Sequence, residues 1–122
     1  MGEGDAAIDT IKKAIRLNPK HHKYVVAYLA LAYLTAGRYQ DVIKTIEPHY
    51  EWFARRGWPI MSFFAAAHAA TDQDEKARNV MKAYLAKKRG LTLSRFSYVR
   101  LYKRPEDRLR VTDLLRKAGM PE

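Results

Sequence analysis

Apolar residues recur every three or four positions along most of this chain. Ile8, Ile11 and Ile15 follow this spacing near the N-terminus, and Val111 and Leu114 follow it near the C-terminus. The spacing is that of an α-helix with one buried face. No stretch alternates between apolar and polar residues over the length of a strand. The sequence therefore predicts an all-α fold.

Proline and glycine residues mark the expected ends of the helices. Pro59 and Pro105 are suited to a first helical turn, and Gly37 and Gly90 are suited to the position after a helix. Pro48 falls inside an apolar stretch and should kink or break the helix there, because proline removes a backbone donor. The expected helices cover about residues 5–17, 22–36, 39–56, 59–70, 74–89 and 105–118, with a linker and a short helical stretch at 91–103.

The four central segments form two helix pairs that repeat along the chain. The pairs superimpose when Gly37 is placed over Asp72, which gives a period of 35 residues. Periods of this length are typical of stacked helical hairpins, in which each hairpin buries its apolar face against its neighbours. Small residues then let two helices approach, and large apolar residues fill the remaining space.

The repeated residues resemble the pattern of the tetratricopeptide repeat (TPR) family. The matching residues are Ala30, Tyr33, Gly37, Val42, Ile46 and His49 in the first pair, Ala65, His68, Asp72, Ala77, Met81 and Tyr84 in the second, and Gly2, Ala7, Ile11, Ala14 and Pro19 in the opening half-repeat. The resemblance covers residues 2–89 and implies a TPR-like α–α superhelix of about two and a half hairpins. His49, Tyr84 and Asp72 depart from the family pattern, so irregular helix spacing is expected.

The C-terminal residues carry a second resemblance. Leu93–Glu122 is similar to the final segment of bacterial proteins that join a class III adenylate or guanylate cyclase domain to TPR repeats, with a Pro-acid helix start and a terminal LRKAGMPE. The resemblance implies that residues 90–122 are a linker and basic capping helix, and that the chain is the C-terminal regulatory or scaffold part of a signalling protein. The chain begins inside a repeat, so we expect it to be cut from a longer protein. It has no counterpart of the cyclase residues, so no cyclase activity is implied.

The excess of basic over acidic residues is confined to the last third of the chain. Residues 1–75 carry 9 basic and 9 acidic side chains, whereas residues 76–122 carry 14 basic and 4 acidic ones, which accounts for the net charge of +10. Such asymmetry is typical of a surface that binds nucleic acid, anionic lipid or an acidic protein, and also of a solvated basic surface without a fixed partner. The candidate basic surface comprises Lys87, Lys88, Arg89, Arg95, Arg100, Lys103 and Arg104.

The stretch from Arg95 to Arg104 also interleaves cations with aromatic residues. Those rings could stack on bases. Alternatively, Phe96, Val99 and Tyr102 lie at helical spacing and would pack inward with the cations outside, which is the interpretation we favour.

The sequence favours binding over catalysis. It has no cysteine, which excludes thiolate chemistry and Cys-ligated zinc. It also lacks a G-x-S-x-G elbow and a phosphate-binding glycine loop, so no enzyme activity, cofactor or metal is expected. Of the four histidines, His21 and His22 are assigned to an exposed turn, and His49 and His68 to packing positions. No apolar run approaches 18 residues and the N-terminus is acidic, so we expect no membrane insertion and a cytoplasmic protein.

The TPR resemblance also implies a concave groove. Its lining would be Tyr24, Ala27, Leu31, Leu34 and Thr35 from the first pair, and Pro59, Ser62, Phe63, Ala66, Ala69 and Ala70 from the second. A groove of this apolar character suits an apolar peptide or helix of a protein partner. The alternative is that the helix at 105–118, or the remainder of a parent chain, fills it. A third possibility is a homodimer that pairs through Ala7, Ile11 and Ala14.

Overall fold

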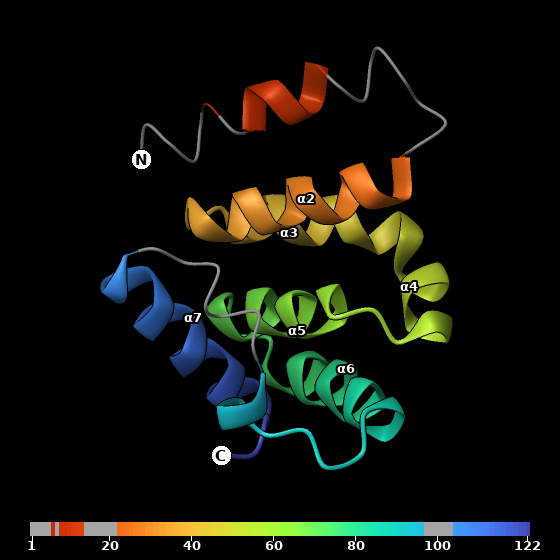
Figure 1. Cartoon of the computed structure of the whole chain (residues 1–122), viewed down its shortest axis with the longest axis vertical. Helices are drawn as coiled ribbons and strands as arrows, with labels where there is room; N and C mark the ends of the chain where they lie inside the picture. The colour runs from red at the N-terminus through yellow and green to blue at the C-terminus, as the bar shows by residue number, and fades with distance from the viewer. Residues whose placement is uncertain (1–5, 7, 14–21, 97–103) are drawn as a thin grey trace.

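The computed structural model is all-α over the residues that it describes, which are 6, 8–13, 22–96 and 104–122. After a short helix at residues 8–13, the elements are α2 (His22–Thr35), α3 (Tyr39–Ile46), the 3-10 turn η2 (Glu47–His49), α4 (Tyr50–Arg56), α5 (Ile60–Ala70), α6 (Asp74–Lys87), the 3-10 turn η3 (Leu93–Arg95) and α7 (Pro105–Ala118) (Figure 1). The expected all-α class is therefore confirmed, and most observed ends lie within one or two residues of the expected ones.

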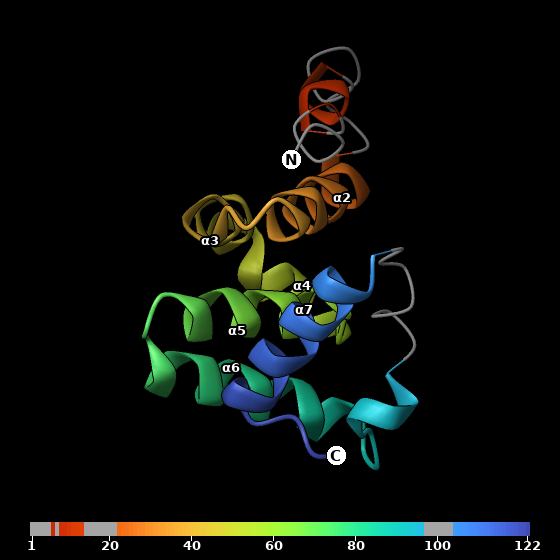
Figure 2. The same cartoon turned by 90° about the vertical axis from the view of Figure 1, so that its left-hand side faces the viewer.

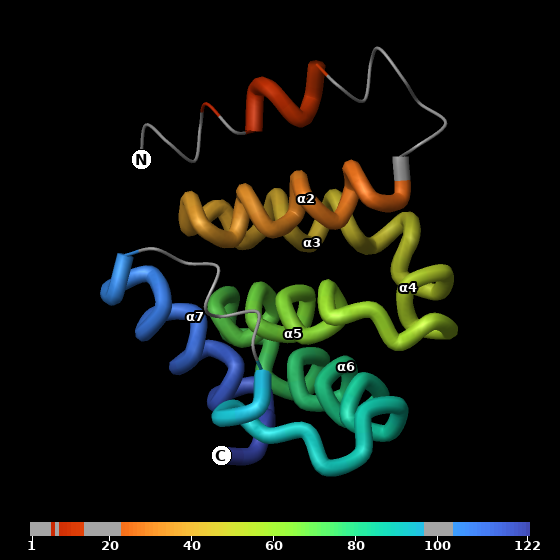
Figure 3. The backbone as a smooth tube through the Cα atoms, in the orientation of Figure 1, coloured from red at the N-terminus to blue at the C-terminus, as the bar shows by residue number. Residues whose placement is uncertain are grey.

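Helix α5 lies at the centre of the molecule. It contacts α2, α3, α4, α6 and α7, and every residue from Ile60 to Ala69 is buried (Figure 3). Its sequence explains this position, because a helix that is apolar on all sides must be covered on all sides. Four alanines in the run Ala65–Ala67 and Ala69 leave no bulky side chain to hold the neighbouring helices away.

The two helical hairpins, α2 with α3 and α5 with α6, close with the same turn. Gly37 has φ +75° and Asp72 has φ +60°, and Asp72 is the only described residue other than glycine with positive φ. A short polar side chain tolerates this left-handed conformation better than most. The matching backbone hydrogen bonds run from Arg38 N to Tyr33 O (2.8 Å) and from Gln73 N to His68 O (2.9 Å). The backbone therefore takes the same kind of turn at Gly37 and at Asp72, the two residues that were superimposed in the sequence.

The predicted break at Pro48 is also confirmed. Helix α3 ends at Ile46, a 3-10 turn contains Pro48, and α4 begins at Tyr50 in a new direction. The change of direction places Phe53 in the core, where it is fully buried. The long third segment therefore acts as two helices.

Helix α7 crosses α5 and joins the two hairpins (Figure 2). Arg110 donates hydrogen bonds to the carbonyl oxygens of Leu34 (3.1 Å) and Thr35 (2.9 Å) at the end of α2. Lys117 Nζ donates to the carbonyl oxygen of Ala69 (2.9 Å) at the end of α5. Leu34 and Ala69 are equivalent positions in the 35-residue repeat. Arg110 and Lys117 are two turns apart on α7, about 10 Å, which matches the usual distance of about 8–10 Å between packed helices.

Candidate interaction surfaces

The second half of the expected groove is closed in the structure. Ser62, Phe63, Ala66 and Ala69 are buried, and Pro59 and Ala70, at the two ends of this half, keep partial exposure. Helix α7 packs on α5, and the Phe96 ring lies 5.8 Å from that of Phe63. These α5 residues are therefore core residues and cannot line a groove for an outside ligand. The physical reason is that α7 needs a partner for its own apolar stripe and finds it here.

The first half of the expected groove is open along α2, with Leu34 as the exception. Leu34 is fully buried, so it too belongs to the core. Tyr24 is 63% exposed, and Ala27, Leu31 and Thr35 are half-buried. Pro59, at the start of α5, is also half-buried. The exposed face of α2 is thus shorter than the groove that the resemblance implied.

Tyr28 is a surface residue that the sequence analysis missed. Its side chain is 62% exposed, one turn after Tyr24 on the same face of α2. The groove positions taken from the TPR resemblance do not include Tyr28. Its position could still have been inferred, because Tyr24 and Tyr28 are four residues apart and lie on a different face of the helix from the buried Val26 and Leu29. Large exposed aromatic side chains that neighbour each other are more informative than a single one.

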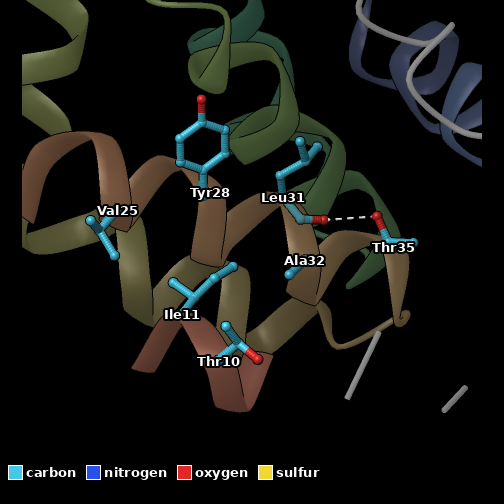
Figure 4. Close-up of a pocket in the computed structure, with 7 residues that line it drawn as sticks. All are labelled: Thr10, Ile11, Val25, Tyr28, Leu31, Ala32 and Thr35. Carbon is cyan, nitrogen blue, oxygen red and sulfur yellow. Dashed lines mark hydrogen bonds between the residues drawn. The ribbon is translucent and has the colours of Figure 1, made fainter. Parts of the chain in front are cut away.

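A cavity of about 490 Å³ lies between the helix at residues 8–13 and α2. It is lined by Thr10, Ile11, Val25, Tyr28, Leu31, Ala32 and Thr35 (Figure 4). Both threonine hydroxyls bond within their own helices, Thr35 to the carbonyl oxygen of Leu31 (2.9 Å) and Thr10 to that of Ala6 (3.0 Å). The cavity therefore offers an apolar lining with few free polar groups, and its volume falls in the range of ligand pockets.

This cavity also bears on the expected homodimer. Ile11 is half-buried and lines the cavity, while Ala7 and Ala14 lie outside the residues that the structure describes. Ile8 is buried against the core. The apolar stripe of the first helix is therefore turned at least in part toward α2.

The candidate basic surface is divided over the molecule. Lys87, Lys88 and Arg89 are exposed at the end of α6, and Arg95 donates a hydrogen bond to the carbonyl oxygen of Gly90 nearby (3.3 Å). Arg104 is exposed just before α7. Arg100 and Lys103, like Val99 and Tyr102 of the inward stripe, lie outside the described residues. Phe96 is buried against the core, so it packs inward and does not offer a face for a base.

Two of the four histidines considered from the sequence, His49 and His68, have packing roles. His49 is half-buried, and its Nδ1 lies 2.8 Å from Lys23 Nζ, which can only donate. His68 is buried in the core with its ring 4.6 Å from that of Phe64. Within the described part of the chain, His68 Nδ1 has no hydrogen-bond partner. His21 lies outside the described residues, and His22, assigned to the same turn, is the first residue of α2.

Burial lowers the pKa of His68, and the positive charge of Lys76 adds to this, against weaker opposite effects of Glu47 and Gln73. Just below about pH 6.5, the ordinary pKa of histidine, the unfolded chain therefore takes up a proton at His68 while the folded protein keeps the ring neutral. The stability that His68 contributes is complete above about pH 6.5 and falls as the pH drops below it. When the pH is lowered from about 7.5 to about 5.5, the free energy of unfolding should fall less for His68→Phe than for the wild type. Urea titrations at the two pH values measure both decreases. Equal losses in both proteins would contradict the assignment.

No group of three or more histidine, aspartate or glutamate side chains among the described residues is arranged to hold a metal ion. None of the described helices combines the length and the apolar character that a membrane span requires. Comparison of the chain with protein-family models, with curated proteins and with solved structures gave no match.

Proposed function

We propose that this chain is a non-catalytic protein-interaction module with a TPR-like arrangement of hairpins, which binds an apolar or amphipathic segment of a protein partner on the open face of α2. The observation that carries the proposal is the pair Tyr24 and Tyr28, 63% and 62% exposed, beside the cavity of about 490 Å³. The turns that repeat after 35 residues support the TPR-like arrangement. The similarity of Leu93–Glu122 to cyclase–TPR proteins supports a role in the cytoplasm as the C-terminal regulatory part of a signalling protein.

The chemistry of this face favours a peptide ligand. Tyrosines lose little conformational entropy on binding and supply a large contact area with a polar end. Fully burying one large apolar side chain contributes roughly 1.5–3 kcal/mol, so the two tyrosines and the lining of the cavity would supply much of the contact energy of a bound peptide. The net charge of +10, which comes from residues 76–122 rather than from α2, adds a long-range attraction for a ligand with acidic polar positions.

The proposal is tested with a displayed library of amphipathic helical peptides that carry acidic polar faces. We expect selected peptides to bind the wild-type chain and to lose about tenfold or more in affinity for Tyr28→Ser, because a central aromatic contact is lost. Thr10→Trp should weaken the same peptides, because the new ring fills the cavity that Thr10 borders.

The matched control is Ala86→Ser, at an exposed position on α6. It should leave peptide affinity unchanged, and all three variants should unfold within about 0.5 kcal/mol of the wild type, since surface substitutions cost little. Selected peptides that bind Tyr28→Ser and Thr10→Trp as tightly as the wild type would refute the α2 face as the binding surface.

A further inference from the structure

Cations from two distant parts of the chain meet where α4 and α6 end. Arg55 and Arg56 close α4, and Lys87 closes α6 and is followed by Lys88. Gly57, with φ +63°, turns the chain so tightly that a methyl group on it would lie 3.3 Å from Lys87 Cδ and 3.6 Å from Lys88 Cε. Both helix ends lie on the same side of the molecule (Figure 1). We call the residues Arg55, Arg56, Lys87, Lys88 and Arg89 the α4–α6 basic surface.

The charge of the α4–α6 basic surface is not neutralised by neighbouring carboxylates. All five side chains are exposed, and none takes part in the ion pairs found within the described residues. By contrast, Arg110, Arg116 and Lys117 on α7 each pair with an acid. The sequence from Lys76 to Arg104 contains ten cations and no Asp or Glu. A positive surface of this kind attracts a polyanion.

Aromatic rings border the same surface. Trp58 follows Gly57, and its ring lies 5.1 Å from the rings of both Tyr24 and Trp52. The Arg56 guanidinium lies 3.9 Å from the centre of the Trp52 ring. Trp58 is half-buried, whereas Tyr24 leaves most of its ring in solvent. An exposed ring near cations that make no ion pair within the described residues is a combination that suits single strands, since bases stack on rings while phosphates contact cations.

We propose that the α4–α6 basic surface, with Tyr24 at its border, binds single-stranded nucleic acid. The aromatic border favours a nucleic acid over an acidic peptide. Bases can stack on the rings, whereas a peptide made of acidic residues would contact the cations alone. This surface shares Tyr24 with the peptide-binding face proposed above, whereas Tyr28 and the cavity belong to that face alone and the five cations belong to this surface alone. Cations in a last helical turn also stabilise the helix, an effect on folding that the test measures separately.

The test measures fluorescence anisotropy of a labelled single-stranded oligonucleotide, both DNA and RNA, between about 50 mM and about 200 mM salt. If five phosphates are neutralised, the logarithm of the affinity should fall against the logarithm of salt with a slope of about −3.5, at about −0.7 per phosphate. Lys87→Gln with Lys88→Gln should make that slope shallower by about 1.4. The matched control is Lys13→Gln with Lys44→Gln, which removes two exposed charges elsewhere and should leave the slope unchanged.

Stacking is tested at Tyr24. Tyr24→Ala should weaken single-strand binding by about fivefold to about a hundredfold at every salt concentration, and Tyr24→Phe should retain it, because the ring rather than the hydroxyl carries the contact. Thermal unfolding of each variant separates lost binding from lost folding.

Several outcomes would overturn the proposal. One is the absence of binding at about 50 mM salt, where phosphate contacts are strongest. Another is an equal change of the salt slope in the Lys87/Lys88 and Lys13/Lys44 double variants, which would show that binding depends on net charge and not on this surface. Polyglutamate or anionic vesicles that compete as well as the oligonucleotide, or a Tyr24→Ala variant that binds like the wild type, would assign the surface to a different polyanion.

Discussion

A chain that ends at residue 104 is expected to lose its cooperative thermal unfolding transition. Removing α7 uncovers α5 and deletes three large buried side chains, Val111, Leu115 and Met120. At roughly 1.5–3 kcal/mol for each, their loss amounts to about 4.5–9 kcal/mol. The total stability of a domain of this size is about 5–15 kcal/mol, so the remaining fold should be marginal or absent. Near-ultraviolet circular dichroism during heating measures the result.

A pair of leucines on α7 gives this prediction a control within the intact chain. Leu115 is fully buried and Leu109 is 61% exposed. Leu115→Ala should lower the free energy of unfolding by about 2–5 kcal/mol, because it removes packed atoms and leaves a cavity. Leu109→Ala, with the same chemistry in solvent, should change it by about 0.5 kcal/mol or less. If the shortened chain melts like the full one, or if the two leucine variants are equally stable, α7 does not cover the core as described.

Arg110→Met is expected to lower the free energy of unfolding by about 2–4 kcal/mol, since each unsatisfied acceptor costs about 1–3 kcal/mol. The Arg110 guanidinium donates to the carbonyl oxygens of Leu34 and Thr35, and to the Tyr39 hydroxyl at 2.7 Å. A methionine fills similar space but donates nothing, so the end of α2 loses its capping partner. Urea unfolding at a single pH measures the change.

Two further variants separate the hydrogen bonds from the charge. Arg110→Lys keeps the charge but lacks the planar fork that reaches several acceptors at once, so most of the loss should remain. Lys117→Met should cost about 1 kcal/mol or less, because Lys117 makes one backbone hydrogen bond and its ion pairs are with Asp72 and Asp74, whose side chains are open to solvent. An Arg110→Met protein as stable as the wild type would show that these contacts do not hold α7 in place.

The features that could be predicted from the sequence are those encoded by neighbouring residues. Helical spacing and the break at Pro48 depend on contacts within a few residues. The shared turn geometry of Gly37 and Asp72 could be inferred by aligning the sequences of the two helix pairs. The buried position of His68 followed in the same way, because it stands where Tyr33 stands in the first hairpin.

The features that could not be predicted depend on contacts between distant segments. The spacing of Ser62, Phe63 and Ala66 is the same whether a ligand or α7 covers them, so it did not show that this half of the groove is closed. The contact of Arg110 with the end of α2 joins residues about 76 positions apart. In the same way, no local pattern shows that the turn at Gly57 lies against the side chains of Lys87 and Lys88, because this contact joins segments that are far apart in the sequence.

The closure of α5 by α7 limits how long a bound segment can be. Of the expected groove, the described part that remains open lies mainly along α2, whose 14 residues span about 21 Å at 1.5 Å per residue. That length accommodates about four turns of a helical ligand, or about six residues of an extended one. If the proposed function holds, a target that must run across two consecutive hairpins would find the second already covered by α7, so we expect short sequence elements to bind in preference to long ones.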